Sequence, residues 1–395
     1  MPKLTCTAAA QPEELSLPQI KTERGKRMEL KTQRNSNIEL LRIIAMLMII
    51  AHHCALYGFY PEDVQYSSNK WIIDFLYSYG KVGVNIFVLI TGYYMTEQSF
   101  RISRVLRIAG QVWFYSLCGL AVVLLIPGVS LERTDIVQSF FPIVNNRYWF
   151  ASSYLFLVMI SPAINVFVHK ASRGLLQGTL AVLIIGCLVL PTLFDNMSFY
   201  SPMSWFVLLY ITGSYIRLWR QDAGRPEKHL AWAIFWTLTI PAYAWVGIAL
   251  WEPTGGGGMS FMISPLNREG SIIGYMAAVE FFEWARSRQP KHWPWVNRIA
   301  GFAFGVYLFH ENPFFRELVW PFIGISDKIY SRFLLLWAAV IMITIYLIGS
   351  VIELVRQKTV GRLWDSAVNK FSPSLEQWGS STLQKISDRI DRRDS

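Results

Sequence analysis

Four ionisable residues lie within one apolar stretch, ELLRIIAMLMIIAHHC, at residues 39–54. They are Glu39, Arg42, His52 and His53. Ionisable side chains are costly inside a bilayer, and those found there usually mark functional sites. A neutral imidazole can take a proton from a hydroxyl group and return it, while a guanidinium group binds anions. The stretch therefore predicts acid–base chemistry on a membrane-embedded helix, with an anionic substrate that enters from the cytoplasmic side.

Helical geometry separates the two histidines. Each residue of an α-helix advances by about 100° and about 1.5 Å, so His53 shares a face with Arg42 at a distance of roughly 16 Å. His52 points about 80° away, whereas Glu39 lies within about 40° of His53. The spacing thus favours His53 as the base, with Glu39 ordering or balancing Arg42. A structural alternative stays open, in which Glu39 and Arg42 form an interfacial ion pair and the histidines only bond to a neighbouring helix.

The composition is that of a membrane protein. Hydrophobic residues make up 53% of the chain and charged residues only 16%, against about 25% charged residues in soluble proteins. Apolar runs close to the roughly 20 residues of a spanning helix recur along the sequence. They predict an all-α, polytopic fold with ten transmembrane helices, of which the eighth is interrupted by glycine, proline and arginine. The ten spans are residues 38–57, 78–95, 104–125, 148–168, 175–194, 203–219, 229–251, 269–284, 298–319 and 333–355.

Charge predicts the orientation and the domains. Lys and Arg are about twice as frequent in the even-to-odd connections as in the opposite ones, which places both termini in the cytoplasm. Residues 1–36 form a basic cytoplasmic arm that has no apolar signal-peptide core and suits contact with anionic lipids rather than nucleic acid. Residues 37–355 form the transmembrane domain, and residues 356–395 form a polar cytoplasmic tail that could be an amphipathic surface helix.

Several common kinds of site are not indicated. The four cysteines are dispersed, and the sequence has no Walker loop, dinucleotide-binding loop or glycine-flanked serine nucleophile. The two adjacent histidines diverge too far on a helix to bind one metal ion readily. We therefore expect no metal and no tightly bound cofactor.

The first helix also resembles that of a known family. Glu39, Arg42 and His53 match the acidic residue, arginine and histidine of the integral-membrane acyltransferase family 3, whose members O-acylate bacterial polysaccharides and related glycans. GVNIFVLITGYYM at residues 83–95 resembles the second-helix motif of the family, with Asn85 in place of the usual aspartate. RVLRI at residues 104–108 resembles its basic motif, but Ser103 stands where the first arginine is usual.

Two further motifs point to the branch found among exopolysaccharide genes. They are YWFASSYLFLVMISPAIN at residues 148–165 and GVYLFHENPFFRELVW at residues 305–320. The resemblance covers residues 37–355 and implies a multi-pass enzyme of the bacterial plasma membrane. It implies transfer of a small acyl group, such as acetyl, from cytoplasmic acyl-CoA to a sugar hydroxyl. The implied partners are acyl-CoA, a glycan or lipid-linked sugar acceptor, the lipid bilayer and other polysaccharide-assembly proteins.

Helix depth divides the candidate residues into two layers. His53, His310, Asn85 and Tyr154 fall in one layer of the outer half of the membrane, whereas the arginines of the basic motif lie at the cytoplasmic boundary. We predict that the catalytic residues are His53, Arg42 and Glu39, and that Arg42, Arg104 and Arg107 hold the phosphates of acyl-CoA. The predicted substrate-binding residues are Asn85, Trp149, Tyr154, His310, Glu311, Asn312 and Arg316. Pro313 is expected to break the ninth helix above His310.

Two mechanistic versions and two other protein classes stay open. His53 could act as a general base or as an acyl carrier, and the sequence does not choose between them. A transporter or flippase of a lipid-linked glycan would have a similar composition, although no two-fold hydropathy repeat is present. A glycan polymerase would be expected to carry a longer external loop.

Overall fold

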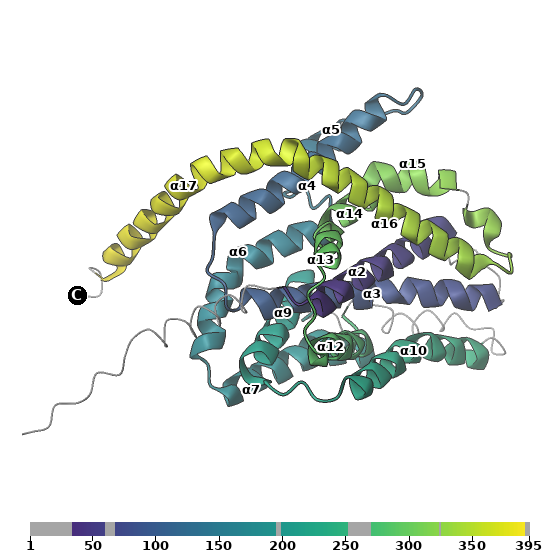
Figure 1. Cartoon of the computed structure of the whole chain (residues 1–395), viewed down its shortest axis with the longest axis horizontal. Coiled ribbons are helices and arrows are strands. Elements are labelled where there is room, and N and C mark those ends of the chain that lie inside the picture. The colour runs from purple at the N-terminus through teal and green to yellow at the C-terminus, as the bar shows by residue number, and fades with distance from the viewer. Residues whose placement is uncertain (1–33, 60–67, 195–198, 252–269, 324, 392–395) are drawn as a thin grey trace, which may run out of the picture.

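Helix α2 (Ser36–His53) lies at the centre of the helical bundle (Figure 1). The computed structural model describes residues 34–59, 68–194, 199–251, 270–323 and 325–391. The side chain of Asn35 caps the start of α2 by accepting a hydrogen bond from the backbone N–H of Asn37 (3.1 Å). The apolar run that follows is long and apolar enough to cross a membrane. Of its most hydrophobic stretch of 18 residues, 56% is buried inside the protein. This burial puts the ionisable stripe of α2 inside the protein rather than against lipid.

The helix does not end at the histidines. It continues as a π-helical segment, Cys54–Phe59, which widens the turn directly after His53. Such segments are frequent at functional sites because they change the direction in which side chains project. Here the segment places Tyr57 over His53, with ring centroids 5.4 Å apart and planes 27° from parallel.

Helix α3 (Ser68–Met95) packs antiparallel to α2 at very short range. A Cβ atom on Gly80 would lie 2.2 Å from Cβ of His52, and one on Gly83 would lie 2.5 Å from the carbonyl oxygen of Ala45. Small residues permit this close approach of helices in membranes. The two glycines thus fix the position of one wall of the site described below.

The remaining helices surround this pair. In chain order they are α4 (Ile102–Leu124), α5 (Arg133–Phe140), α6 (Trp149–Lys170), α7 (Arg173–Ile184), α8 (Leu190–Phe194), α9 (Pro202–Trp219), α10 (Pro226–Trp251), α12 (Ile272–Ser287), α13 (Pro294–Ala300), α14 (Ala303–His310), α15 (Pro313–Ile323), α16 (Leu334–Lys358) and α17 (Val360–Asp391). A π-helical segment, Ile185–Val189, joins α7 to α8, and a short 3-10 helix, Ile325–Lys328, precedes α16. No strand occurs in the part of the chain that the structure describes.

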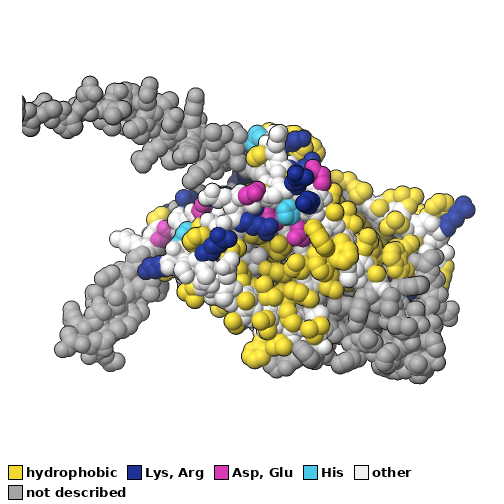
Figure 2. Space-filling model, turned by 90° about the horizontal axis from the view of Figure 1, so that it is seen from below, with side chains coloured by type: hydrophobic (Ala, Val, Ile, Leu, Met, Phe, Trp, Pro, Cys, Tyr) yellow, Lys and Arg dark blue, Asp and Glu magenta, His cyan; other side chains and the backbone are white. Residues whose placement is uncertain are grey.

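Six helical segments within the described residues are long and apolar enough to cross a membrane. They correspond to the first five and the last of the ten predicted spans, so the all-helical membrane fold is confirmed while the count of ten stays a prediction. The residues predicted to interrupt the eighth span lie outside the described residues, which resume at residue 270 before α12. Figure 2 shows a broad face of apolar side chains with charged side chains gathered at one end. Helix α16 contributes to the lipid-facing surface, because only 22% of its most apolar stretch of 18 residues is buried inside the protein.

The predicted ninth span is divided into three helices, α13, α14 and α15. The expected break at Pro313 is confirmed: α14 ends at His310 and α15 begins at Pro313, which has no backbone N–H to continue the helix. The side chain of Asn312 caps the new helix by accepting from the backbone N–H of Phe314 (3.0 Å). The break leaves His310 and Glu311 at a helix end beside α2.

The polar tail forms α17, which follows α16 directly and lies along α4 (Figure 1). Trp364 fills the space above Gly110, and its indole N–H donates to the carbonyl oxygen of Leu106 (3.1 Å). The first turns of the tail are therefore docked on the transmembrane domain.

Candidate active site

The imidazole of His53 is bonded directly to that of His310. Nδ1 of His53 lies 2.9 Å from Nε2 of His310, and both side chains are buried. Nδ1 of His310 lies 2.6 Å from the carbonyl oxygen of Val306, which can only accept, so this nitrogen carries a proton. With both rings neutral, Nε2 of His310 then accepts from Nδ1–H of His53. This chain of bonds leaves the lone pair of His53 on Nε2.

The second ring nitrogen of His53 faces the carboxyl group of Glu311. Nε2 lies 3.2 Å from Oε2 of Glu311, whose side chain is buried between α2 and α15. The other oxygen of Glu311 accepts from Nη1 of Arg316 (3.2 Å) and from the hydroxyl of Tyr57 (3.5 Å). The same nitrogen of Arg316 donates to the Tyr57 hydroxyl (3.1 Å). A proton accepted at Nε2 would thus be stabilised by a carboxylate that Arg316 holds in place.

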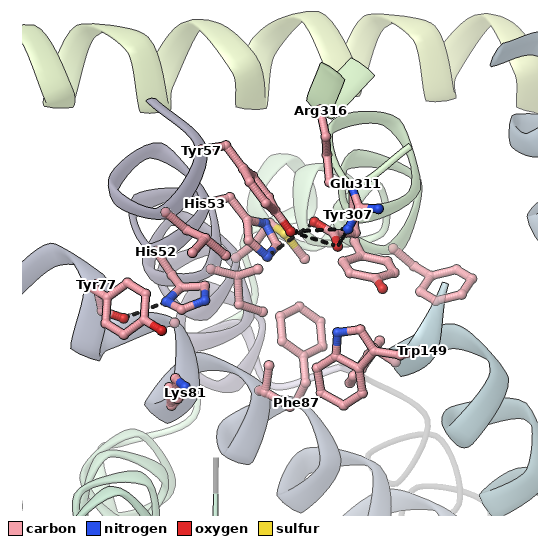
Figure 3. A pocket seen from close by; sticks show the side chains of 17 residues that line it. His52, His53, Tyr57, Tyr77, Lys81, Phe87, Trp149, Tyr307, Glu311 and Arg316 are labelled. Carbon is pink, nitrogen blue, oxygen red and sulfur yellow. Dashed lines mark hydrogen bonds and ion pairs between the residues drawn. The ribbon is translucent and has the colours of Figure 1, made fainter. Parts of the chain in front are cut away.

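These side chains border a cavity of about 210 Å³ between α2, α3, α6, α14 and α15 (Figure 3). His53, Glu311 and Arg316 lie on its polar side, and the aromatic rings of Phe87 and Trp149 form part of the opposite wall. The apolar wall lowers the local dielectric and so strengthens the electrostatic interactions of a reacting group.

Five of the predicted site residues come together around this cavity. His53, Trp149, Glu311 and Arg316 line it, and His310 contacts His53 from behind. His52 lines it as well, although its Nδ1 contacts the carbonyl oxygen of Tyr77. The distinction that helical spacing drew between the two histidines is thus visible in their partners.

Besides His310, three predicted substrate-binding residues lie outside the cavity lining. Oδ1 of Asn85 accepts from the indole N–H of Trp205 (2.7 Å), while the hydroxyl of Tyr154 accepts from Thr91 (3.3 Å). The amide nitrogen of Asn312 donates to the carbonyl oxygen of Tyr115 (3.0 Å) and to the hydroxyl of Tyr148 (2.8 Å).

Asn85 and Tyr154 nevertheless support cavity residues indirectly. The Trp205 ring that Asn85 holds stacks on Trp149 at 6.4 Å, and the Tyr154 ring stacks on Phe150 at 5.8 Å.

The three arginines predicted to bind phosphate, Arg42, Arg104 and Arg107, lie at the other end of the helices from the cavity. Each of them contacts different residues. Arg42 donates to Glu39 (2.9 Å), so the i,i+3 ion pair is present, with Glu39 buried and Arg42 partly exposed. Arg104 donates to Oε1 of Gln98 (2.6 Å). Arg107 donates to Asp365 (2.8 Å) and Asn369 (2.7 Å), both on α17.

Sequence reasoning did not select Tyr57, Lys81 or Tyr307, which also line the cavity. A signal existed for each: Lys81 is a charge inside an apolar run, Tyr57 follows His53 by four residues, and Tyr307 precedes His310 by three. No group of His, Cys, Asp and Glu suited to a metal ion occurs in the ranges that the structure describes.

The fold and the cavity define a helical membrane protein with a buried acid–base centre. The family model described as "Acyltransferase domain" matches residues 35–353, which is most of the chain. The chain therefore belongs to acyltransferase family 3, and it is a membrane acyltransferase. Searches of curated proteins and of solved structures gave no match.

Proposed function

We propose that this protein transfers a small acyl group from cytoplasmic acyl-CoA to a sugar hydroxyl of an exported or cell-surface polysaccharide in the bacterial plasma membrane. The observation that carries the proposal is the position of Nε2 of His53, which borders the cavity beside Glu311 while His310 contacts Nδ1. A base in this tautomeric state is what a neutral hydroxyl nucleophile requires.

The reaction proceeds by direct transfer. The acceptor oxygen attacks the thioester carbonyl carbon as Nε2 of His53 takes the hydroxyl proton, and the imidazolium formed is stabilised by Glu311. The tetrahedral intermediate then expels the thiolate, the C–S bond breaks, and the sulfur takes the proton back from Nε2. The products are an ester and free CoA, and His53 returns to its starting state.

The donor extends from the cytoplasmic boundary to the cavity. Arg42 lies three helical turns below His53, roughly 16 Å along α2, which is within reach of the pantetheine arm of CoA. Arg42, Arg104 and Arg107 bind the nucleotide phosphates, since guanidinium groups pair bidentately with phosphate oxygens. The partly exposed Arg42 keeps donors available beside its bond to Glu39.

The acceptor sugar lies against the aromatic wall of the cavity. Trp149 offers an apolar face of the kind on which sugar rings pack, and Arg316 and Glu311 offer polar contacts beside it. Asn85, Tyr154 and Asn312 keep the surrounding helices in position through their hydrogen bonds.

The test uses purified protein in lipid nanodiscs with labelled acetyl-CoA or succinyl-CoA and host polysaccharide. We expect His53→Ala to lower kcat by at least ~10²-fold. His169→Gln is the matched control, because His169 contacts a backbone carbonyl oxygen outside the cavity and should retain activity. Translocation of unlabelled glycan by a wild-type protein that transfers no label would favour a transporter instead.

Binding of the donor head is tested with a truncated donor. Arg42→Ala should raise KM for acetyl-CoA by about tenfold or more, but leave KM for acetyl-pantetheine, which lacks the nucleotide, unchanged. Equal effects on the two donors would contradict the phosphate role of Arg42.

A further inference from the structure

The hydroxyl group of Tyr307 is buried and finds no hydrogen-bond partner among the described residues. A buried hydroxyl without a partner is costly, and most such groups are satisfied in folded proteins. Tyr307 lines the cavity that contains His53, and Figure 3 shows its hydroxyl directed into the space bounded by His53 and Trp149. The unused donor therefore points to a ligand atom.

The ring that carries this hydroxyl is held firmly. It contacts Phe150 at a centroid distance of 5.2 Å, Phe304 at 6.2 Å and His310 at 6.2 Å. The contact with His310 is nearly perpendicular, at 88°, so the tyrosine and the histidine pair fix one another. A donor fixed before the reaction costs no reorganisation when charge develops near it.

Three other polar groups at the cavity, those of Tyr57, Glu311 and His53, have roles that do not include donation to the acyl group. The Tyr57 hydroxyl donates to Glu311 and accepts from Arg316. Glu311 is an acceptor in its ionised form, and Nε2 of His53 is the base, so neither can donate to a developing negative charge. Tyr307 offers an uncommitted O–H on the wall of the same cavity.

We propose that Tyr307 is a catalytic residue whose hydroxyl donates a hydrogen bond to the carbonyl oxygen of the acyl group. This inference rests on the proposed acyl transfer and adds the group that stabilises its intermediate. When the acceptor oxygen bonds to the carbonyl carbon, the C=O electron pair moves to oxygen and His53 takes the hydroxyl proton. Tyr307 keeps its own proton throughout and donates to the oxyanion until the C–S bond breaks.

The test compares Tyr307→Phe with the wild-type protein in nanodiscs, at saturating acetyl-CoA and acceptor. We expect kcat to fall by about 10²–10³-fold, as on loss of one oxyanion donor elsewhere. Both KM values should change by less than about threefold, because the bond forms mainly in the transition state. The thermal unfolding midpoint should stay the same or rise, since the deleted hydroxyl has no partner to lose.

Tyr275→Phe is the matched control. Its hydroxyl is buried outside the cavity lining and bonds to Oγ1 of Thr212 (2.9 Å). This variant should unfold at a lower temperature and retain kcat, which is the opposite pattern.

Three results would overturn the assignment. An unchanged kcat in Tyr307→Phe overturns the assignment alone, while the transferase function stands. A rise in acceptor KM without a fall in kcat makes Tyr307 a binding residue instead. A wild-type protein that transfers no acyl group overturns the proposed function and this assignment with it.

Discussion

His53 and His310 are 257 residues apart in the chain, yet their ring nitrogens lie 2.9 Å from each other. The contact links the end of α2 to the break between α14 and α15. It also fixes protons, because the carbonyl oxygen of Val306 holds the Nδ1 proton of His310 and thereby makes Nε2 of His310 an acceptor. The second histidine thus acts on the first by selecting its tautomer, as a positioning residue.

Replacement of His310 tests this tautomer selection. His310→Leu removes the acceptor for Nδ1–H of His53, so we expect kcat to fall by about 10²–10⁴-fold, within the range of general base catalysis. His310→Gln keeps an acceptor oxygen in reach and should recover part of that loss. The kcat values of the two variants are compared by steady-state kinetics, and their stabilities are compared by thermal unfolding midpoints. Equal kcat losses in Leu and Gln variants of equal stability would argue against the acceptor role.

Glu311 and Arg316 should behave as a coupled pair. Glu311→Gln removes the charge that stabilises imidazolium formed at His53 and leaves the partly buried Arg316 without its carboxylate. We therefore expect lower kcat and lower stability from this single change.

A double-mutant cycle with Arg316→Gln measures the coupling. Removal of both charges should restore stability toward that of the wild type, with a coupling energy of about 0.5–3 kcal/mol, but should not restore kcat. The measurements are unfolding midpoints and turnover. Strictly additive stability losses would show that the two groups do not interact.

The parts of this site that follow local periodicity were predictable from the sequence. The shared face of Glu39, Arg42 and His53 follows from 3.6 residues per turn, and the ion pair of Glu39 with Arg42 is an i,i+3 neighbour contact. The break at Pro313 follows from the missing N–H of proline. These features depend on residues close together in the chain.

Other parts depend on contacts between distant segments, which periodicity does not encode. The bond from Asn85 to Trp205 and the pairing of Arg107 with α17 each join residues more than 100 positions apart. The π-helical segment after His53, which widens the turn that carries Tyr57, is likewise not encoded in the hydrophobic periodicity. Depth along the membrane normal placed Asn85 and Tyr154 at the level of His53, but depth alone does not tell which way a side chain points.

The close approach of α2 and α3 predicts a strong size limit at Gly80. In Gly80→Ala the new methyl group would overlap the Cβ atom of His52, so α3 must shift away from α2. We expect a destabilisation of about 1–3 kcal/mol, measured as a lower unfolding midpoint in detergent. Gly178→Ala in α7 is the matched control, because a Cβ there meets nothing within 4 Å and should leave stability equal or slightly higher. Equal midpoints for the two variants would mean that the helices are less tightly packed than the structure shows.

The contact of Arg107 with Asp365 and Asn369 predicts opposite effects of two substitutions on donor binding. Asp365 occupies the guanidinium group that we assign to a CoA phosphate, so Asp365→Asn should lower KM for acetyl-CoA by a few fold. Arg107→Ala should raise the same KM, and neither change should alter KM for acetyl-pantetheine. The ion pair is half exposed, with side-chain exposures of 43% and 53%, so its loss should cost little stability. A higher acetyl-CoA KM in Asp365→Asn would instead mean that the carboxylate orients Arg107 for the donor rather than competing with it.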